Sequence, residues 1–364
     1  KRVSAPGVGV FTGGRADRIG AEIGGQCLAR LGQQPRAAVA QPFAAGGGRG
    51  RRIRVWYRGG FRLGRGIGRG DGLRFLRRRC GLRRGRARLG LLRDGHVIDL
   101  TTASDGRLPP DMLTFLRQGG PALQLARQVA ENATASTPVS GVRLLAPIPN
   151  PSKIVAIGLN YMDHCREQNV KPPERPIIFC KFSTAVVGPG ATIRWDPALT
   201  QQVDYEVELG VVMGRAARRI PAAEALDYVA GYTICNDVTA RDLQHGDRQW
   251  VRGKSLDTFC PLGPWLVTRE EIPDPQDLAL RCTLNGQVMQ DSTTAEMIFG
   301  VAYLIEFISR AFTLLPGDVI ATGTPHGVGV FRSPQVFMKD GDVVTVEVEG
   351  LGRLTNDCRE EPQV

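Results

Sequence analysis

The sequence lacks a long uninterrupted apolar run, although 42% of its 364 residues are hydrophobic. A membrane-spanning helix needs about 20 consecutive apolar residues, so we expect no membrane partner. The sequence also lacks any Cys-x-x-Cys pair, and its eight cysteines are scattered. Scattered cysteines in a long chain indicate reduced thiols inside a cell, and they argue against a disulfide framework or a four-cysteine zinc site.

Acidic residues are nearly missing from the first 88 residues, which hold 22 Lys and Arg but only Asp17, Glu22 and Asp71. This segment has a net charge of +19, so the rest of the chain carries −8 of the total of +11. A strongly basic protein can bind polyanions, but here the basic charge is confined to one segment. We therefore do not expect nucleic acid as the partner of the main body.

Residues 1–86 are rich in Gly and Arg, with few apolar residues at strand or helix spacing. Such a segment cannot bury enough surface to offset its conformational entropy, so we expect it to be disordered and outside the fold. Three interpretations remain open: an arginine–glycine RNA-binding tail, a mitochondrial transit peptide, or an artefact of the gene model. The RNA-binding interpretation lacks support from aromatic residues, because Trp56, Tyr57 and Phe61 are nearly isolated.

Turn signals and apolar periodicity predict ordered structure from residue 87 onward. Two short apolar runs flank Asp94-Gly95, which predicts a hairpin, and two helical patterns meet at Gly119-Gly120-Pro121. We predict a small leading α+β domain over residues 87–140. A stretch rich in Ser, Thr and Pro follows, and we assign residues 141–152 to a linker and residues 153–358 to a catalytic domain.

Strand signals dominate residues 153–358. Asn285-Gly286 stands between two extended runs, which is typical of a tight hairpin turn. One clear amphipathic helix is predicted between residues 296 and 312, with apolar residues at helical spacing: Ile298, Val301, Leu304, Ile305, Ile308 and Phe312. Many strands with few helices predict a β-rich α+β fold and argue against a doubly wound sheet.

A group of acidic residues lies on one predicted strand, "VDYEVELGVV". Side chains alternate along a strand, so Asp204, Glu206 and Glu208 share one face. A solvated strand face is the ordinary interpretation, but the strand runs directly into an apolar stretch, 209–213. Like charges near a core need a compensating cation, and a hard ion such as Mg²⁺ prefers carboxylate oxygens.

Asp237, at the end of another apolar run, is the candidate for a third carboxylate. Its alternative role is a helix N-cap before "VTARDLQ", and the two roles are compatible. His164 and Glu167 are three residues apart, so on a helix they are neighbours. A His held by a carboxylate can act as a general base, although such pairs are also common on surfaces.

Two further segments carry polar residues among small ones. Lys254 in "GKSLDTF" could contact an oxyanion or a carboxylate, but on this segment alone a solvated surface lysine is the better interpretation. "ATGTPHGVG" predicts a Gly-rich turn, with Thr322 and Thr324, that can present backbone N–H groups to an anion. It lacks the Gly-Lys-Ser/Thr of a nucleotide-binding loop.

Together these motifs resemble the fumarylacetoacetate hydrolase family. "GLNYMDH", "DYEVELGVV", "NDVTARDLQ", "GKSLDTFCPLGP" and "PGDVIATGTPHGVG" occur in the family's order, and the resemblance covers about residues 154–356. It implies a β-roll or sandwich as the catalytic domain, an acidic pocket for Mg²⁺ or Mn²⁺, and a homodimer. An upstream aspartate that serves as a further ligand in the hydrolase proper has no evident counterpart here, which favours the branch with smaller substrates.

The resemblance also implies a role for each matched residue. The implied metal ligands are Glu206, Glu208 and Asp237; the implied catalytic residues are His164, Glu167 and Lys254, the first two on a lid helix; and the implied substrate-binding residues are Arg241, Gln244 and Thr324.

For function, the branch resemblance implies the keto–enol interconversion of oxaloacetate, a small 2-oxo acid, in mitochondria, with the cytoplasm as the alternative location. The same pocket chemistry would also suit C–C hydrolysis of acylpyruvates or fumarylpyruvates, or decarboxylation of oxaloacetate, because all pass through an enolate. From another class, a nucleic-acid-binding protein that uses its Arg/Gly segment stays open.

Overall fold

The structure is a computed structural model, and it describes residues 52–57 and 87–361. All of these residues belong to one compact unit that spans residues 44–364. Our expectation of disorder for residues 1–51 and 58–86 lies outside the described residues. Within the described part of the chain, no helix is long and apolar enough to cross a membrane.

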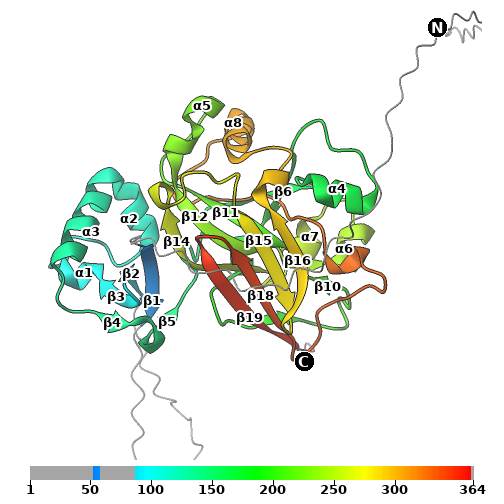
Figure 1. Ribbon diagram of the computed structural model, residues 1–364, viewed down its shortest axis with the longest axis horizontal. Coiled ribbons are helices and arrows are strands. Elements are labelled where there is room, and N and C mark those ends of the chain that lie inside the picture. Colours follow the sequence, from blue (N-terminus) through cyan, green and yellow to red (C-terminus); the bar gives the residue numbers. More distant parts are fainter. Residues whose placement is uncertain (1–51, 58–86, 362–364) are drawn as a thin grey trace, which may run out of the picture. The chain divides into compact units, whose positions relative to one another are not determined.

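The described N-terminal part combines a hairpin with three helices (Figure 1). The predicted turn at Asp94-Gly95 is present, with φ values of 49° and 76°, both in the left-handed region that a tight hairpin turn requires. The predicted helix break lies at Gly119, where φ is 66°. The elements are β2 (Ala87–Arg93), β3 (His96–Asp99), α1 (Leu100–Ala103), α2 (Met112–Gln118), α3 (Gly120–Asn132), β4 (Thr137–Pro138) and β5 (Arg143–Leu144).

Twelve of the described strands form one sheet, in the order β4-β3-β2-β1-β14-β12-β11-β17-β6-β7, with β5 beside β1 and β8 beside β14. This sheet joins the N-terminal hairpin to the strands that carry the predicted carboxylates. Its remaining strands are β1 (Arg52–Tyr57), β6 (Ile154–Gly158), β7 (Ile177–Lys181), β8 (Val186–Val187), β11 (Val207–Met213), β12 (Val229–Asn236), β14 (Cys260–Thr268) and β17 (Val319–Ala321).

A second sheet has the order β16-β15-β18-β19-β9. The predicted turn at Asn285-Gly286 joins two of its strands, with φ values of 51° and 82°. Its strands are β9 (Ile193–Trp195), β15 (Ala279–Leu284), β16 (Gln287–Thr293), β18 (Val343–Val348) and β19 (Gly352–Glu360), and a separate short pair consists of β10 (Val203–Asp204) and β13 (Thr239–Ala240).

The helices of this part are short, apart from the predicted amphipathic one. That helix is α8 (Val301–Ala311); Ile298 precedes it and Phe312 is its C-cap, so it is shorter than its apolar pattern suggested. The others are α4 (Met162–Gln168), α5 (Ala222–Ala225), α6 (Arg241–Gly246) and α7 (Val251–Lys254).

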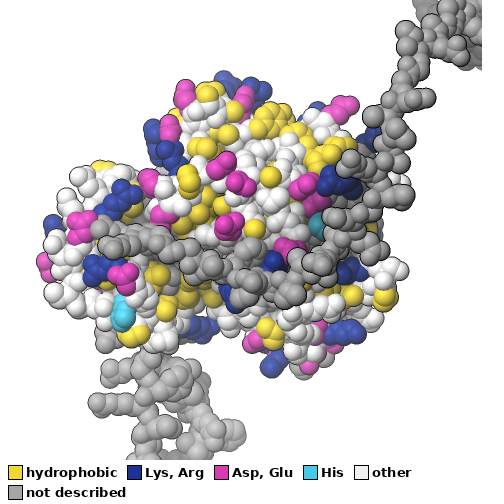
Figure 2. Space-filling model, viewed as in Figure 1, with side chains coloured by type: hydrophobic (Ala, Val, Ile, Leu, Met, Phe, Trp, Pro, Cys, Tyr) yellow, Lys and Arg dark blue, Asp and Glu magenta, His cyan; other side chains and the backbone are white. Residues whose placement is uncertain are grey.

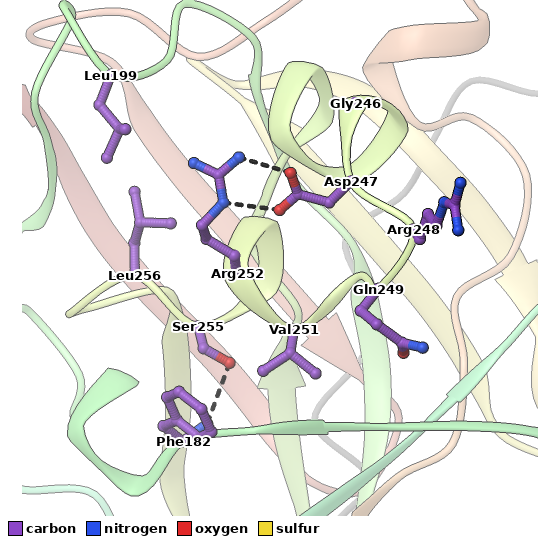
Figure 3. Close-up of a pocket in the computed structure, with 10 residues that line it drawn as sticks. All are labelled: Phe182, Leu199, Gly246, Asp247, Arg248, Gln249, Val251, Arg252, Ser255 and Leu256. Atoms are coloured by element: carbon purple, nitrogen blue, oxygen red, sulfur yellow. Dashed lines mark hydrogen bonds and ion pairs between the residues drawn. The ribbon is translucent and has the colours of Figure 1, made fainter.

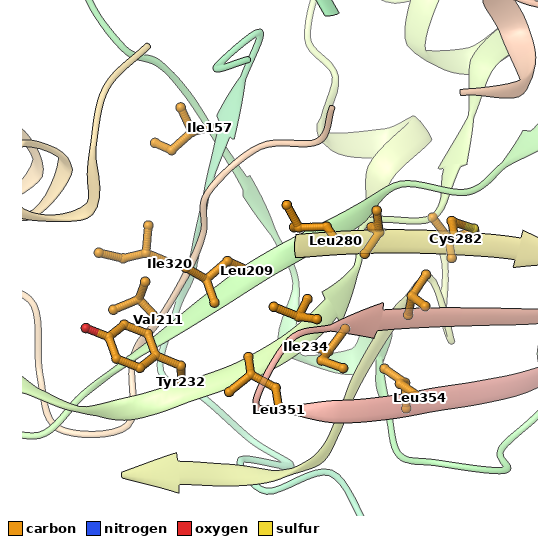
Figure 4. Packing of buried hydrophobic residues seen from close by; sticks show 14 of the residues in the cluster. Ile157, Leu209, Val211, Tyr232, Ile234, Leu280, Cys282, Ile320, Leu351 and Leu354 are labelled. Atoms are coloured by element: carbon orange, nitrogen blue, oxygen red, sulfur yellow. The ribbon is translucent and has the colours of Figure 1, made fainter. Parts of the chain in front are cut away.

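The core lies where the two sheets face each other. Figure 4 shows Leu209, Ile234, Leu280 and Leu354 meeting there, and all four are fully buried. Each such side chain contributes about 1.5–3 kcal/mol through burial, so this cluster holds β11 and β12 rigidly. The prediction of a β-rich α+β fold is confirmed.

Charged side chains on the surface are of both signs. On the face shown in Figure 2, Lys and Arg side chains alternate with Asp and Glu side chains. This mixture agrees with the net charge of −8 outside the first 88 residues.

Strand β1 differs from our expectation for residues 1–86. It pairs with β2 along its whole length, from Arg52 opposite Leu92 to Tyr57 opposite Ala87, and also with β14 and β5. The sequence "RIRVWY" does alternate charged and apolar residues at its start, but the alternation is short and is surrounded by Arg and Gly. Long-range pairing with strands on both sides, which composition does not reveal, accounts for this strand.

We therefore predict that β1 stabilises the fold. A chain starting at residue 87 lacks β1, and its β2 and β14 lose a pairing partner, whereas a chain starting at residue 51 keeps it. The shorter chain should melt several degrees lower, since about 1 kcal/mol corresponds to roughly 2–4 °C in a domain of this size. Thermal melts of the two chains test this, and equal melting temperatures would place β1 outside the stable fold.

Candidate metal centre and active site

Three buried carboxylates converge between β11 and β12. Glu206, Glu208 and Asp237 each offer an oxygen, and these oxygens all lie within 4.8 Å of one another. Antiparallel pairing of β11 with β12 places Val207 opposite Asn236. Glu206, just before Val207, and Asp237, just after Asn236, are therefore next to the same pair of opposite residues. Asp237 follows the last residue of β12 and does not cap α6, whose N-cap is Ala240.

The strand that carries these glutamates is interrupted, contrary to the continuous strand we predicted. β10 ends at Asp204 and β11 begins at Val207. At the break, the Glu206 N–H donates to Asn236 Oδ1 (3.0 Å), in place of a ladder bond to another backbone. Asp204 and Glu206 both contact Arg241, but their other partners differ.

Asp204 acts as an anchor, and its oxygens are fully engaged. It accepts hydrogen bonds from Arg241 Nε (2.8 Å) and from the N–H groups of Gly329 (2.8 Å) and Val330 (3.0 Å). Arg241 in turn donates from Nη1 to Gln244 Oε1 (3.0 Å). Asp204 therefore fixes the guanidinium that we predicted on the substrate side.

Arg241 also keeps one donor without a hydrogen-bond partner. Its Nη2 is 2.8 Å from Glu206 Oε1, which makes an ion pair, but the geometry is not that of a hydrogen bond and the buried Nη2 has no other acceptor. Burial would lower the pKa of Arg241, but Asp204 and Glu206 outweigh it and raise the pKa. A buried donor without an acceptor is costly and points to a ligand oxygen.

Two lysines compensate part of the negative charge. Lys254 Nζ donates to Glu206 Oε2 (2.7 Å) and to Asp237 Oδ2 (2.8 Å), and Lys181 Nζ donates to Asp237 Oδ1 (2.5 Å). Burial alone would raise the pKa of Asp237, but these two ammonium groups outweigh it and lower the pKa. Sequence analysis missed Lys181; its only signal was a lysine ending the apolar run "IIFCK".

Glu208 is the carboxylate left without such compensation. Among the described residues no cationic side chain lies within ion-pair distance of it, and the N–H of Gly323 donates to its Oε2 (3.1 Å). Burial raises its pKa well above the usual value, and Asp237 and Glu206 add to the rise. A divalent cation would offset this charge, so the donor set fits a divalent metal ion.

The Gly-rich turn is fixed to β11. Gly323 has φ of 98°, and a Cβ there would lie 2.8 Å from the Asn160 side chain, so the turn requires glycine. The Thr324 hydroxyl donates to the Val207 carbonyl (2.9 Å) and accepts from Gln290 Nε2 (2.8 Å). Thr324 therefore has a fixed position beside Glu206.

Helix α4 places the predicted His–Glu pair. His164 Nδ1 lies 2.8 Å from Glu167 Oε2, and Glu167 Oε1 accepts a hydrogen bond from the Gly327 N–H (2.8 Å). The imidazole also makes an edge contact with the ring of Phe331, with centroids 5.8 Å apart. One carboxylate thus orients the imidazole and connects α4 to the Gly-rich turn.

A second contact holds α4 in place, and sequence analysis did not identify it. Asp163 Oδ2 lies 2.9 Å from His326 Nδ1 and accepts a hydrogen bond from Ser292 Oγ (2.5 Å). Asp163 is 8% exposed, whereas the His326 side chain is exposed, so only the carboxylate of this pair is buried. The sequence signal was only its position next to His164.

These residues surround a cavity of about 330 Å³. Its lining includes six of the nine predicted site residues, while Glu208, Asp237 and Glu167 lie behind the lining and contact it. The lining residues are Ile157, Gly158, Leu159, His164, Gln168, Ile177, Phe179, Glu206, Arg241, Gln244, His245, Trp250, Lys254, Thr324 and Phe331.

A larger hollow of about 770 Å³ lies on the outer side of α6 and α7, and it holds none of the predicted site residues (Figure 3). Two of its polar contacts are internal: Arg252 donates to both Asp247 oxygens (2.6 and 2.7 Å), and Ser255 Oγ accepts from the Phe182 N–H (3.2 Å). An exposed ion pair of this kind contributes little to stability.

The site defines a class of enzyme: a buried carboxylate cluster suited to a divalent metal, beneath a short helix that presents a His–Glu pair. Comparison with known proteins identifies the family. The family profile described as "Fumarylacetoacetate (FAA) hydrolase C-terminal" matches residues 153–359, and the chain belongs to the fumarylacetoacetate hydrolase family.

Individual relatives agree with this assignment. The chain is 50% identical over 264 residues to "Oxaloacetate tautomerase FAHD2A, mitochondrial" of Bos taurus, which covers 72% of this chain and 83% of that protein. It is 43% identical over 285 residues to the "Fumarylacetoacetate hydrolase domain-containing protein 2 homolog" of Dictyostelium discoideum, which covers 75% and 92%. The solved structure of a fumarylacetoacetate hydrolase from Exiguobacterium antarcticum aligns with a TM-score of 0.68 at 36% identity, over 85% of this chain and 100% of that chain.

A first prediction from this geometry concerns metal binding. Replacing Glu208 with Gln keeps the shape of the side chain but removes the carboxylate that lacks an ion-pair partner. The affinity for Mg²⁺ or Mn²⁺ should therefore fall by at least roughly tenfold, which is the lower end of the losses seen when the surroundings of a metal are changed. Titration calorimetry measures the affinity, with Glu296→Gln on the surface as the matched control. Equal affinity in both variants would remove Glu208 from the ligand set.

A second prediction concerns the anchoring of α4. Asp163→Asn weakens the contacts to His326 and Ser292, so α4 should spend less time in the position that the structure shows. The kcat of the enzyme should then fall by up to about 100-fold, which is the cost of a misplaced catalytic group. Glu296→Gln, which removes the exposed Arg166–Glu296 pair of the same helix (2.8 Å), should have little effect. Metal affinity should be unchanged in both variants, and a kcat equal to that of the unmodified protein in Asp163→Asn would contradict the anchoring role.

Proposed function

We propose that this protein is a divalent-metal-dependent oxaloacetate tautomerase, which interconverts the enol and keto forms of a small 2-oxo acid. The single observation that carries the proposal is the His164–Glu167 pair, held at 2.8 Å on the wall of a cavity whose floor is a buried carboxylate cluster. Relatives about 50% identical over most of the chain are named oxaloacetate tautomerase, and solved relatives are named isomerases.

The carboxylate cluster supplies the metal ligands in this proposal: Glu206, Glu208 and Asp237, with Mg²⁺ or Mn²⁺ as the ion. Such an ion, when bound, stabilises negative charge on the 2-oxygen of a 2-oxo acid and so acidifies the C–H bonds at C3. Lys181 and Lys254 hold two of the three carboxylates in place through the hydrogen bonds described above. Their positive charge lowers the pKa of Asp237 and so keeps that carboxylate ionised.

His164 moves the proton. Because Nδ1 faces Glu167, the ring nitrogen Nε2 is the one that can face substrate. The imidazole takes a proton from C3 and delivers it to the 2-oxygen, and in the other direction it takes the enol O–H proton and delivers it to C3, while the Glu167 carboxylate stabilises the charged ring. The N–H of Gly327 keeps Glu167 oriented for this task.

The remaining residues hold the substrate. Arg241 Nη2 is the buried donor without an acceptor, and it suits a substrate oxygen beside Glu206. Gln244 and Thr324 line the same cavity, where the Gln244 amide N–H can donate to the C1 carboxylate, and the Thr324 hydroxyl can do so once it turns from the Val207 carbonyl. Lys254 lies between Glu206 and Asp237 and places positive charge next to the developing enolate.

Location and assembly also belong to the proposal. We place the enzyme in mitochondria because the relatives are named mitochondrial, and we expect a homodimer, as the family resemblance implies. Light scattering coupled to size-exclusion chromatography measures the assembly, and a monomeric mass would contradict that part.

The test of the function is the decay of enol-oxaloacetate absorbance. The protein should accelerate the decay, EDTA should abolish the acceleration, and added Mg²⁺ or Mn²⁺ should restore it, because the carboxylate cluster alone cannot stabilise the 2-oxygen. If acetylpyruvate is cleaved instead and oxaloacetate decays at its spontaneous rate, the protein is a C–C hydrolase of the same family.

His164→Ala tests the assignment of the base. We expect kcat to fall by roughly 10²- to 10⁴-fold, the usual contribution of a general base. Metal affinity should barely change, since His164 is not a proposed ligand. His96→Ala, on the exposed hairpin β2–β3, serves as the matched control. Full turnover in His164→Ala would assign the proton transfer to another group.

A further inference from the structure

The walls of the cavity differ in chemistry from its floor. Most of the side chains above the carboxylate cluster are large and apolar, and three of them are aromatic: Phe179, Trp250 and Phe331. We call these three residues the aromatic walls. Three aliphatic residues, Ile157, Leu159 and Ile177, complete the apolar lining.

The positive charge in the cavity is gathered at one place. Arg241 and Lys254 are its only Lys or Arg lining residues among those described, and both contact Glu206, at 2.8 and 2.7 Å. They can serve the carboxylate and 2-oxygen of a 2-oxo acid at the floor. No third Lys or Arg lines the cavity in the described part of the chain, so Gln168 and His245 are the polar lining residues left for the second carboxylate of oxaloacetate.

The aromatic walls stand on both sides of the reacting position. On the side of Lys254, its Nζ lies 5.1 Å from the centre of the Phe179 ring, which contacts Trp250 edge-on at 5.5 Å. On the side of His164, the imidazole contacts Phe331 at 5.8 Å. A substituent on C3, next to the base, therefore meets an aromatic ring in either direction.

The position of Trp250 depends on a glycine. A Cβ on Gly158 would lie 2.4 Å from the indole ring, so the indole packs directly on the end of β6. The cavity volume of about 330 Å³ lies at the lower end of the range for small-molecule sites, roughly 300–1,000 Å³. The space is thus bounded by apolar surface and is large enough for a small ligand.

We propose that this enzyme also tautomerises 2-oxo acids whose C3 substituent is apolar and uncharged, such as an aryl group, with the aromatic walls as the binding subsite. The inference rests on the proposed tautomerase function and extends its substrate class. In the step, the O–H bond of the enol breaks, a C–H bond forms at C3, and the 2-oxygen becomes a carbonyl. No redox partner or water is consumed.

The probe is phenylpyruvate, supplied as its enol and followed by absorbance decay with the metal-loaded full chain, beside oxaloacetate. The protein should accelerate both decays. Trp250→Ala should lower kcat/KM for phenylpyruvate by roughly 10- to 100-fold, as loss of apolar contacts to a substrate group does. The value for oxaloacetate should change much less.

Matched controls separate a subsite from a folding defect. Trp250→Phe keeps an aromatic ring and should restore most of the phenylpyruvate rate. Trp265→Phe, whose ring packs near Gly352 away from the cavity, should leave the ratio of the two kcat/KM values unchanged.

Two results would overturn the inference while leaving the proposed function intact. One is acceleration of oxaloacetate decay with no effect on phenylpyruvate. The other is an equal loss for both substrates in Trp250→Ala. If the protein accelerates neither the oxaloacetate decay nor the phenylpyruvate decay, the proposed function is overturned together with this inference.

Discussion

The arrangement of this structure depends on negative charge that is buried in its interior. Glu206, Glu208 and Asp237 are buried between two strands of a sheet, and ionised carboxylates in such a place need partners. Lys181 and Lys254 satisfy Asp237 from two sides, and Lys254 also reaches Glu206. The chain supplies cations for two carboxylates and leaves the third for a metal ion, so stability and chemistry depend on the same charges.

The break between β10 and β11 makes this arrangement possible. A continuous strand would have directed Asp204 and Glu206 to one face, as alternation predicts. Instead Asp204 accepts hydrogen bonds from Gly329, Val330 and Arg241, while Glu206 faces the cavity. The two carboxylates thus share Arg241 but differ otherwise, because Asp204 also binds the loop at Gly329 and Val330 and Glu206 lines the cavity.

Local signals in the sequence were sufficient for much of the fold. The turns at Asp94-Gly95 and Asn285-Gly286 have the positive φ values that their residue types favour, and α8 follows its apolar spacing. The convergence of Glu206 and Glu208 also followed from strand geometry. Lys181 and strand β1 did not, because their partners are distant in the chain and neither lies in a distinctive local pattern. Long-range contacts are the part that composition and periodicity do not encode.

The two oxygens of Glu167 have different partners: Oε2 meets His164, and Oε1 accepts from Gly327 of the turn that faces α4. If α4 lifts away to admit substrate, Glu167 loses the Gly327 bond at the same moment that the cavity meets bulk water. The imidazole keeps its own contact with Glu167, because both residues lie on α4, but the turn no longer holds that carboxylate. In the proposed function, admitting substrate and holding the base in a fixed orientation would therefore exclude one another, because both depend on the single bond between Glu167 and Gly327.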